Sequence, residues 1–129
     1  MISLVSFHLD AKDVYLDREH GVVETRDPGT ANLRLVPLSD TGLNTRIVRG
    51  QESPVVQGWL PRGHGIRGVR PIPTVVYERR SAKPVRFLTV FQPLRGGSED
   101  RVLGIVEHDS TIRVTYSSGK TVDFSFPPK

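Results

Sequence analysis

Side chains suited to binding an anion gather in one glycine- and proline-rich stretch, residues 57–73. A guanidinium presents a planar fork of N–H donors that matches a carboxylate or sulfate, and an indole ring can stack on the apolar face of a sugar. The stretch therefore contains the side chains that could bind uronate or sulfate oxygens and is the best candidate site in the sequence. The candidate binding residues are Trp59, Arg62, His64, Arg67 and Arg70.

Each of these residues also has a purely structural interpretation. Trp59 follows Gly58, and a lone tryptophan in such a place often plugs the end of a β-sandwich. The arginines are equally compatible with a flexible basic loop or with contacts to other domains, and an exposed histidine such as His64 is usually only solvated. The stretch exceeds the roughly 12 residues beyond which a loop in a compact domain is usually functional or disordered. It is therefore the main candidate site.

Proton-transfer chemistry has weaker candidates. Tyr77 alternates with Val75 and Arg79 in a predicted strand, where a packed aromatic ring with its hydroxyl at the edge is the commoner arrangement. His8 points to the strand face opposite Phe7 and is an equally weak candidate. We assign no catalytic residue to this chain.

The elements that must position these residues are predicted to be β-strands. Short apolar–polar alternations recur between Gly, Pro, Asn and Asp, and no apolar pattern follows the helical period of about 3.6 residues. The segment 85–92 has apolar side chains on both faces, so we expect a central strand there. The pattern predicts an all-β fold, an antiparallel β-sandwich. Its expected strands are 5–9, 22–25, 33–38, 45–49, 74–79 and 85–92, with three more near the C-terminus.

Loop lengths predict the register of the last three strands, because residues opposite one another in a hairpin share a face of the sheet. We expect a two-residue loop at 109–110 and a three-residue loop with a bulge at 118–120, since this choice gathers the apolar side chains on one face. The opposed pairs predicted in this way are Ile105–Val114, Leu103–Tyr116, Tyr116–Val122 and Val114–Phe124.

Length and composition favour one soluble domain. A chain of 129 residues matches the roughly 100–200 residues of a typical domain, so we predict a single domain over 1–129. The absence of cysteine excludes disulfides and thiolate metal sites but does not determine the compartment. No segment approaches the roughly 18 apolar residues of a membrane span, and the start lacks the order of a signal peptide. We expect no membrane partner.

The charge balance favours an acidic partner. The formal net charge is +4, and the chain contains 14 arginines against 4 lysines, a composition that suits planar carboxylate or sulfate groups. An ordinary solvated surface is compatible with the same numbers. We do not expect nucleic acid binding, because the sequence has no recognition helix and no basic strand interleaved with aromatic residues.

A set of short phrases is spread from near the start of the chain to near its end: Ser6–Asp10, Thr25–Gly29, Asn32–Leu35, Arg49–Gln51, Gln57–Trp59, Pro71–Pro73, Val75–Arg80 and Pro84–Pro93. Together they resemble the C-terminal β-sandwich region of heparinase II/III-like polysaccharide lyases. The resemblance implies a family that cleaves acidic polysaccharides by β-elimination, with a helical toroid domain packed on β-sandwich layers.

β-Elimination from a uronate requires neutralisation of the carboxylate, a base for the C5 proton and an acid for the leaving oxygen. In that family these groups come mainly from the toroid and from earlier strands, neither of which matches this chain. Its four histidines, His8, His20, His64 and His108, do not form the closely spaced pair that the family uses for a structural metal. We therefore expect no metal and no cofactor.

The resemblance thus implies that the chain is the noncatalytic C-terminal sandwich of a lyase and part of a longer enzyme. Its expected partners are an acidic polysaccharide and the upstream catalytic domains of the same chain. Two other functions remain open: a stand-alone carbohydrate-binding module, which needs an exposed aromatic platform, and an immunoglobulin-like interaction module without a glycan role. The fold alone does not separate them.

Overall fold

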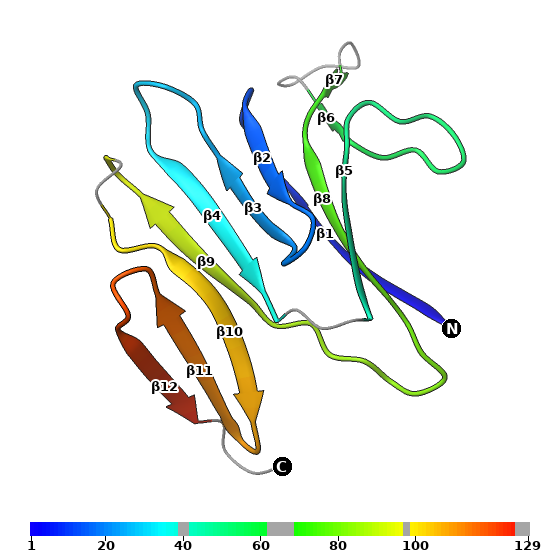
Figure 1. Cartoon of the computed structure of the whole chain (residues 1–129). Coiled ribbons are helices and arrows are strands. Elements are labelled where there is room, and N and C mark those ends of the chain that lie inside the picture. Colours follow the sequence, from blue (N-terminus) through cyan, green and yellow to red (C-terminus); the bar gives the residue numbers. More distant parts are fainter. Residues whose placement is uncertain (39–41, 62–68, 97–98, 126–129) are drawn as a thin grey trace.

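The computed structural model describes residues 1–38, 42–61, 69–96 and 99–125, which form only β-strands, turns and connections. The prediction of an all-β fold of antiparallel sheets is therefore confirmed (Figure 1). The strands are β1 (Ile2–His8), β2 (Val14–Asp17), β3 (Val22–Thr25), β4 (Asn32–Pro37), β5 (Leu43–Val48), β6 (Trp59–Pro61), β7 (Val69–Pro71), β8 (Thr74–Arg80), β9 (Thr89–Leu94), β10 (Val102–His108), β11 (Thr111–Tyr116) and β12 (Thr121–Ser125).

Two sheets form the sandwich. Sheet A has the strand order β1-β8-β5, and sheet B has the order β2-β3-β4-β9. Between them lies a core in which Val23 and Leu35 of sheet B pack with Val75 and Tyr77 of sheet A, all fully buried. Tyr77 is also fixed by a hydrogen bond from its hydroxyl to the carbonyl oxygen of Gly21, 3.0 Å away.

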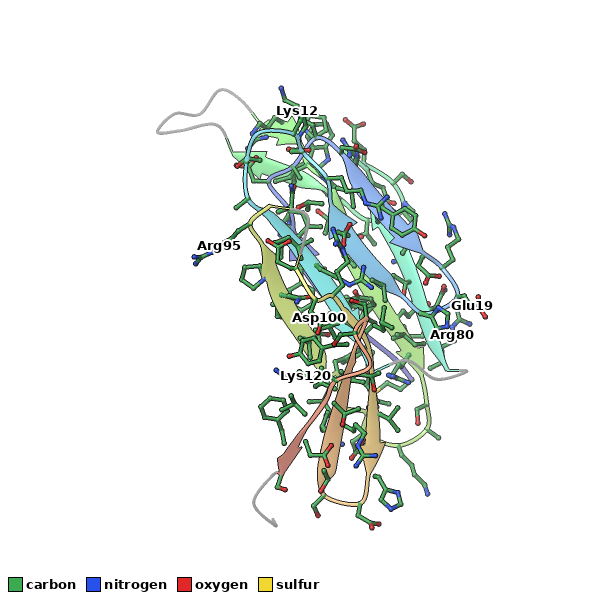
Figure 2. The ribbon with its side chains drawn as sticks, turned by 60° about the vertical axis from the view of Figure 1, so that its left-hand side comes forward. Lys12, Glu19, Arg80, Arg95, Asp100 and Lys120 are labelled. Carbon is green, nitrogen blue, oxygen red and sulfur yellow. The ribbon has the colours of Figure 1, made fainter. Side chains whose placement is uncertain are left out.

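A third sheet, β10-β11-β12, covers part of the other face of sheet B. Val22 and Val36, the chain neighbours of Val23 and Leu35, point to this second face and pack with Val102, Ile105 and other apolar residues of the third sheet. Strands β3 and β4 are therefore buried on both faces, as their apolar sequences require. The third sheet lies toward the end of the molecule opposite Lys12 (Figure 2).

The expectation of a central strand at 85–92 is wrong. The strand there, β9, begins only at Thr89, pairs with β4 alone and is an edge of sheet B. Pro93 lies within it, and proline is tolerated at a sheet edge because it has no N–H to donate. The side chain of Gln92 instead bonds to the β9–β10 connection, donating to Asp100 O and accepting from Val102 N at 2.8 and 2.9 Å.

The loop at Asp109–Ser110 is confirmed, and Ile105 lies opposite Val114 as predicted. Tyr116 lies opposite Val102 and not Leu103, because the register shifts between Val102 and Gly104. A bulge adds one residue to a strand and moves every later pair, which strand parity alone does not reveal.

The β11–β12 loop has three residues, as predicted, but they are 117–119. Val114 therefore lies opposite Val122, and Ile112 opposite Phe124, two residues away from the predicted register. The cause is Gly119, whose φ of 91° places it at the loop position that requires a left-handed backbone. The prediction had placed the three-residue loop one position later, at 118–120.

Candidate functional site

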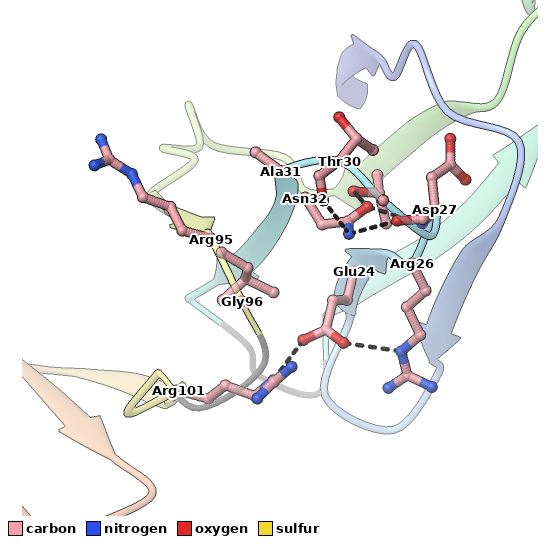
Figure 3. Close-up of a pocket in the computed structure, with 12 residues that line it drawn as sticks. Glu24, Arg26, Asp27, Thr30, Ala31, Asn32, Arg95, Gly96 and Arg101 are labelled. Carbon is pink, nitrogen blue, oxygen red and sulfur yellow. Dashed lines mark hydrogen bonds and ion pairs between the residues drawn. The ribbon is translucent and has the colours of Figure 1, made fainter.

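A pocket lies between the β3–β4 loop and the β9–β10 connection (Figure 3). It is open to solvent and has a volume of about 690 Å³, within the range of about 300–1,000 Å³ of small-molecule sites. Its lining includes the polar residues Glu24, Arg26, Asp27, Asn32, Arg95 and Arg101.

Glu24 forms the charged floor of the pocket. Only 2% of it is exposed, and its carboxylate contacts three arginines from separate parts of the fold. Arg26 Nε lies 2.8 Å from Oε2, while Arg101 Nε and Arg34 Nη1 lie 2.9 and 3.2 Å from Oε1. A buried carboxylate requires such compensation, because an unpaired charge away from water is very costly.

These contacts set the charge state of Glu24. Burial by itself would raise the pKa of the carboxyl, but the hydrogen bonds and charges of Arg26 and Arg101 outweigh it and hold the pKa below its ordinary value. Glu24 is therefore an anion at neutral pH and keeps both guanidiniums in place.

Arg26 and Arg101 use Nε, the nitrogen nearest the side-chain stem, to bond Glu24. Their terminal nitrogens extend past the carboxylate, as Figure 3 shows. The Arg26 guanidinium also lies over the Tyr15 ring, 4.0 Å from its centroid, so it is held on two sides. Arg26 and Arg101 are 50% and 33% exposed, which leaves both accessible to a ligand from solvent.

The loop that forms the other wall of the pocket is fixed by Asp27. Its Oδ1 accepts hydrogen bonds from the backbone N–H groups of Lys12 and Asp13, at 3.0 and 2.7 Å. These two bonds lower the pKa of Asp27. Asn32 closes the loop from the other side, because its side chain bonds to the backbone N–H and C=O of Asp27. The wall is thus ordered by its own hydrogen bonds.

The charge of the pocket favours an anion. Three arginines line it, Arg26, Arg95 and Arg101, against the two carboxylates of Glu24 and Asp27. Arg34 adds a fourth guanidinium beneath Glu24. Both carboxylates are occupied by donors within the protein, whereas Arg95 stands at the rim with its side chain directed outward (Figure 3). An oxyanion is therefore the ligand that this lining can bind best.

Of the residues predicted from the sequence, the structure describes Trp59 and Arg70. Trp59 is half-buried, and its Nε1–H donates to the carbonyl oxygen of Gln51 at 3.0 Å. Its position depends on Gly58, since a Cβ there would lie 2.9 Å from the backbone of Gly50 and Val48. These contacts fit the structural interpretation of the tryptophan, whereas its sugar-binding role stays a prediction.

Arg70 lies opposite Leu60 in the β6–β7 hairpin and pairs with Asp10 at 2.7 Å. Arg62, His64 and Arg67 lie outside the described residues. The β1–β2 connection joins the predicted stretch to the pocket, because Asp10 in it contacts Arg70 and Lys12 in it contacts Asp27. The β6–β7 hairpin and the β3–β4 loop therefore lie at the same end of the sandwich (Figure 1).

The proton-transfer candidates lie away from this pocket. Tyr77 is fully buried in the sandwich core, where burial raises the pKa of its hydroxyl well above the ordinary value. His8 is exposed on β1, and His20 is hydrogen-bonded to Asp17 at 2.9 Å in the β2–β3 turn. Within the described ranges, no three His, Asp or Glu side chains come together as the ligands of a metal would.

Sequence reasoning did not identify Glu24, Arg26 and Arg101 as site residues. A signal was present, because Glu24 and Arg34 are charged residues within apolar strand sequences, where a buried partner is expected. Arg101, the other arginine bonded to Oε1 of Glu24, is 77 residues from Glu24 in the chain, and no local pattern relates the two.

Comparison with models of protein families, with curated proteins and with solved structures finds no match for the chain. In the part of the chain that the structure describes, no helix has the length and apolar character needed to cross a membrane.

Proposed function

We propose that this protein is a noncatalytic β-sandwich that binds an acidic polysaccharide and supports the catalytic domains of a heparinase II/III-like lyase. The observation that carries the proposal is the buried Glu24 carboxylate, which holds Arg26 and Arg101 at an open pocket of about 690 Å³. Two fixed guanidiniums at a pocket of this size suit a sugar that carries a carboxylate or sulfate.

The rest of the lining supports a carbohydrate. Thr30 adds a hydroxyl to the pocket wall, and such a group matches sugar hydroxyls. Arg70 of the predicted stretch pairs with Asp10 in the β1–β2 connection, whose Lys12 contacts Asp27 of the pocket, so we expect a bound polysaccharide to extend from the pocket toward Arg70.

The absence of catalysis is inferred from the lining. Among the described residues of the pocket, none is a tyrosine or a histidine, the side chains that most often move protons in such eliminations. An arginine remains protonated in proteins and does not act as the base for the C5 proton. The catalytic residues are therefore assigned to the upstream domains that the resemblance implies.

Two assays test this function. In the first, the chain is titrated calorimetrically with heparin, alginate and oligogalacturonate fragments and with neutral dextran, and we expect binding to acidic sugars only. In the second, the ultraviolet absorbance of unsaturated uronate is followed with the same substrates, and we expect no increase. Turnover by this chain would refute its noncatalytic role, and equal binding to dextran would refute the role of the arginines.

A further inference from the structure

The two lining guanidiniums that bond to Glu24 come from different sheets. Arg26 follows β3 of sheet B directly, whereas Arg101 precedes β10 of the third sheet. The backbone of Arg101 is bonded to the third sheet, because its N–H donates to Ser117 Oγ and its carbonyl oxygen accepts from Ser117 N, at 3.1 and 2.8 Å. Its side chain alone reaches sheet B, where it meets Glu24.

Glu24 is the group that brings these side chains together. Its Oε2 accepts a hydrogen bond from Arg26 Nε at 2.8 Å and its Oε1 accepts one from Arg101 Nε at 2.9 Å, so the two guanidiniums flank one carboxylate. Arg34 bonds to the same Oε1 and also donates from Nε to Val102 O at 2.7 Å, which fixes the start of β10 against sheet B. Without Glu24, like charges gathered here would repel one another and move apart.

We propose that Glu24 is a positioning residue of the anion site, which orients Arg26 and Arg101 into a two-guanidinium clamp for a single oxyanion of the ligand. This inference rests on the proposed function and adds that an acidic residue is required for binding an acidic ligand. Because the clamp is already formed in the free protein, the ligand does not have to order two long side chains when it binds.

A positioning role and simple charge repulsion predict opposite changes in anion affinity when Glu24 loses its charge. If Glu24 is only a nearby negative charge, Glu24→Gln removes repulsion and an anion binds more tightly. If Glu24 positions the clamp, the same substitution weakens binding, because the amide is a poorer acceptor and its NH₂ group faces one of the arginines. A role limited to stability leaves the affinity of the folded protein unchanged.

The test is a calorimetric titration of folded wild-type protein, Glu24→Gln and Asp123→Asn with a heparin hexasaccharide and a galacturonate oligomer. Asp123 pairs with Arg113 on the third sheet and is not a lining residue, so this variant measures the effect of removing one negative charge elsewhere. We expect Glu24→Gln to bind about tenfold or more weakly and Asp123→Asn to bind as well as wild type or slightly better.

Arg101→Lys provides a second test that does not depend on Glu24→Gln being folded. It keeps the positive charge but replaces the fork by a single ammonium, which cannot bond Glu24 and the ligand in the same geometry. We expect about a tenfold loss of affinity. Unchanged or tighter binding by Glu24→Gln, or unchanged binding by Arg101→Lys, overturns the positioning role while leaving the proposed function intact; failure of wild type to bind either oligosaccharide overturns both.

Discussion

At the scale of single residues, the fold and the site both depend on Glu24. Its removal leaves Arg34, with a side chain only 10% exposed, without its carboxylate. Breaking one partner out of a buried ion pair costs about 3–5 kcal/mol, and we expect the lower part of this range for Glu24→Gln, since Arg26 and Arg101 can turn to water. Urea unfolding at neutral pH measures the loss. Asp123→Asn, which breaks an exposed pair, is the control and should cost under about 1 kcal/mol; equal losses would show that Glu24 is not a structural centre.

The same carboxylate makes stability depend on pH in a defined direction. The pKa of Glu24 in the folded chain lies below the ordinary value of 4.5, so its contribution is complete above that value and is lost as the pH falls through the folded pKa. The difference in unfolding free energy between wild type and Glu24→Gln should therefore be largest at neutral pH and shrink in acid. A difference that stays constant down to pH values well below 4.5 would contradict the charged role of Glu24.

Whether a site residue could be predicted from the sequence depends on how far apart in the chain its contacts lie. Trp59 and Arg70 were predicted as one group, and the structure places them on paired strands, because hairpin neighbours are close in the chain. The Glu24 cluster joins residues in β3 and β4 with Arg101, which lies just before β10, and only the packing of two sheets brings them together. Such a cluster becomes visible only when the fold is known.

At the scale of elements, Gly119 fixes the register of the β11–β12 hairpin. A Cβ at Gly119 would have open space around it, but its φ of +91° is strained for any L side chain. Gly119→Ala should therefore cost about 1 kcal/mol or more. Gly104 in β10 is a matched control with equally open space and no such φ, so Gly104→Ala should have little effect in the same thermal unfolding assay. Similar losses for both would exclude the backbone as the cause.

The predicted strands and loops were right where side-chain alternation and loop length alone determine the structure. They were wrong where backbone conformation or contacts to other segments also matter. Parity and turn length determined the two-residue loop at Asp109–Ser110, and the structure agrees. For the loop at 117–119, parity allowed two registers, and the backbone need of Gly119 selected between them. For β9, the apolar sequence suggested a central strand, yet Pro93 and the Gln92 contacts to the next connection make it an edge.

At the scale of the whole molecule, the position of sheet B leads us to expect that the chain unfolds as a single domain. Both faces of sheet B are buried, one against sheet A and one against the third sheet. Neither outer sheet can therefore unfold separately without exposing buried apolar side chains. We expect Trp59 fluorescence, which reports the hairpin next to sheet A, and hydrogen exchange of the β11 amides to give the same free energy of unfolding. Unfolding of the third sheet at lower denaturant than Trp59 would show two separate units.

The central claim is that the Arg26–Glu24–Arg101 cluster binds an acidic sugar, and one titration tests it most directly. Wild type, Arg26→Met and Arg113→Met are compared with a heparin hexasaccharide at one ionic strength; the control Arg113 pairs with Asp123 and is not a lining residue of the pocket. The account predicts that Arg26→Met loses about tenfold or more in affinity, as expected for a charged hydrogen bond, while Arg113→Met binds like wild type apart from a small loss of general charge attraction. Equal affinity of the two variants would contradict it.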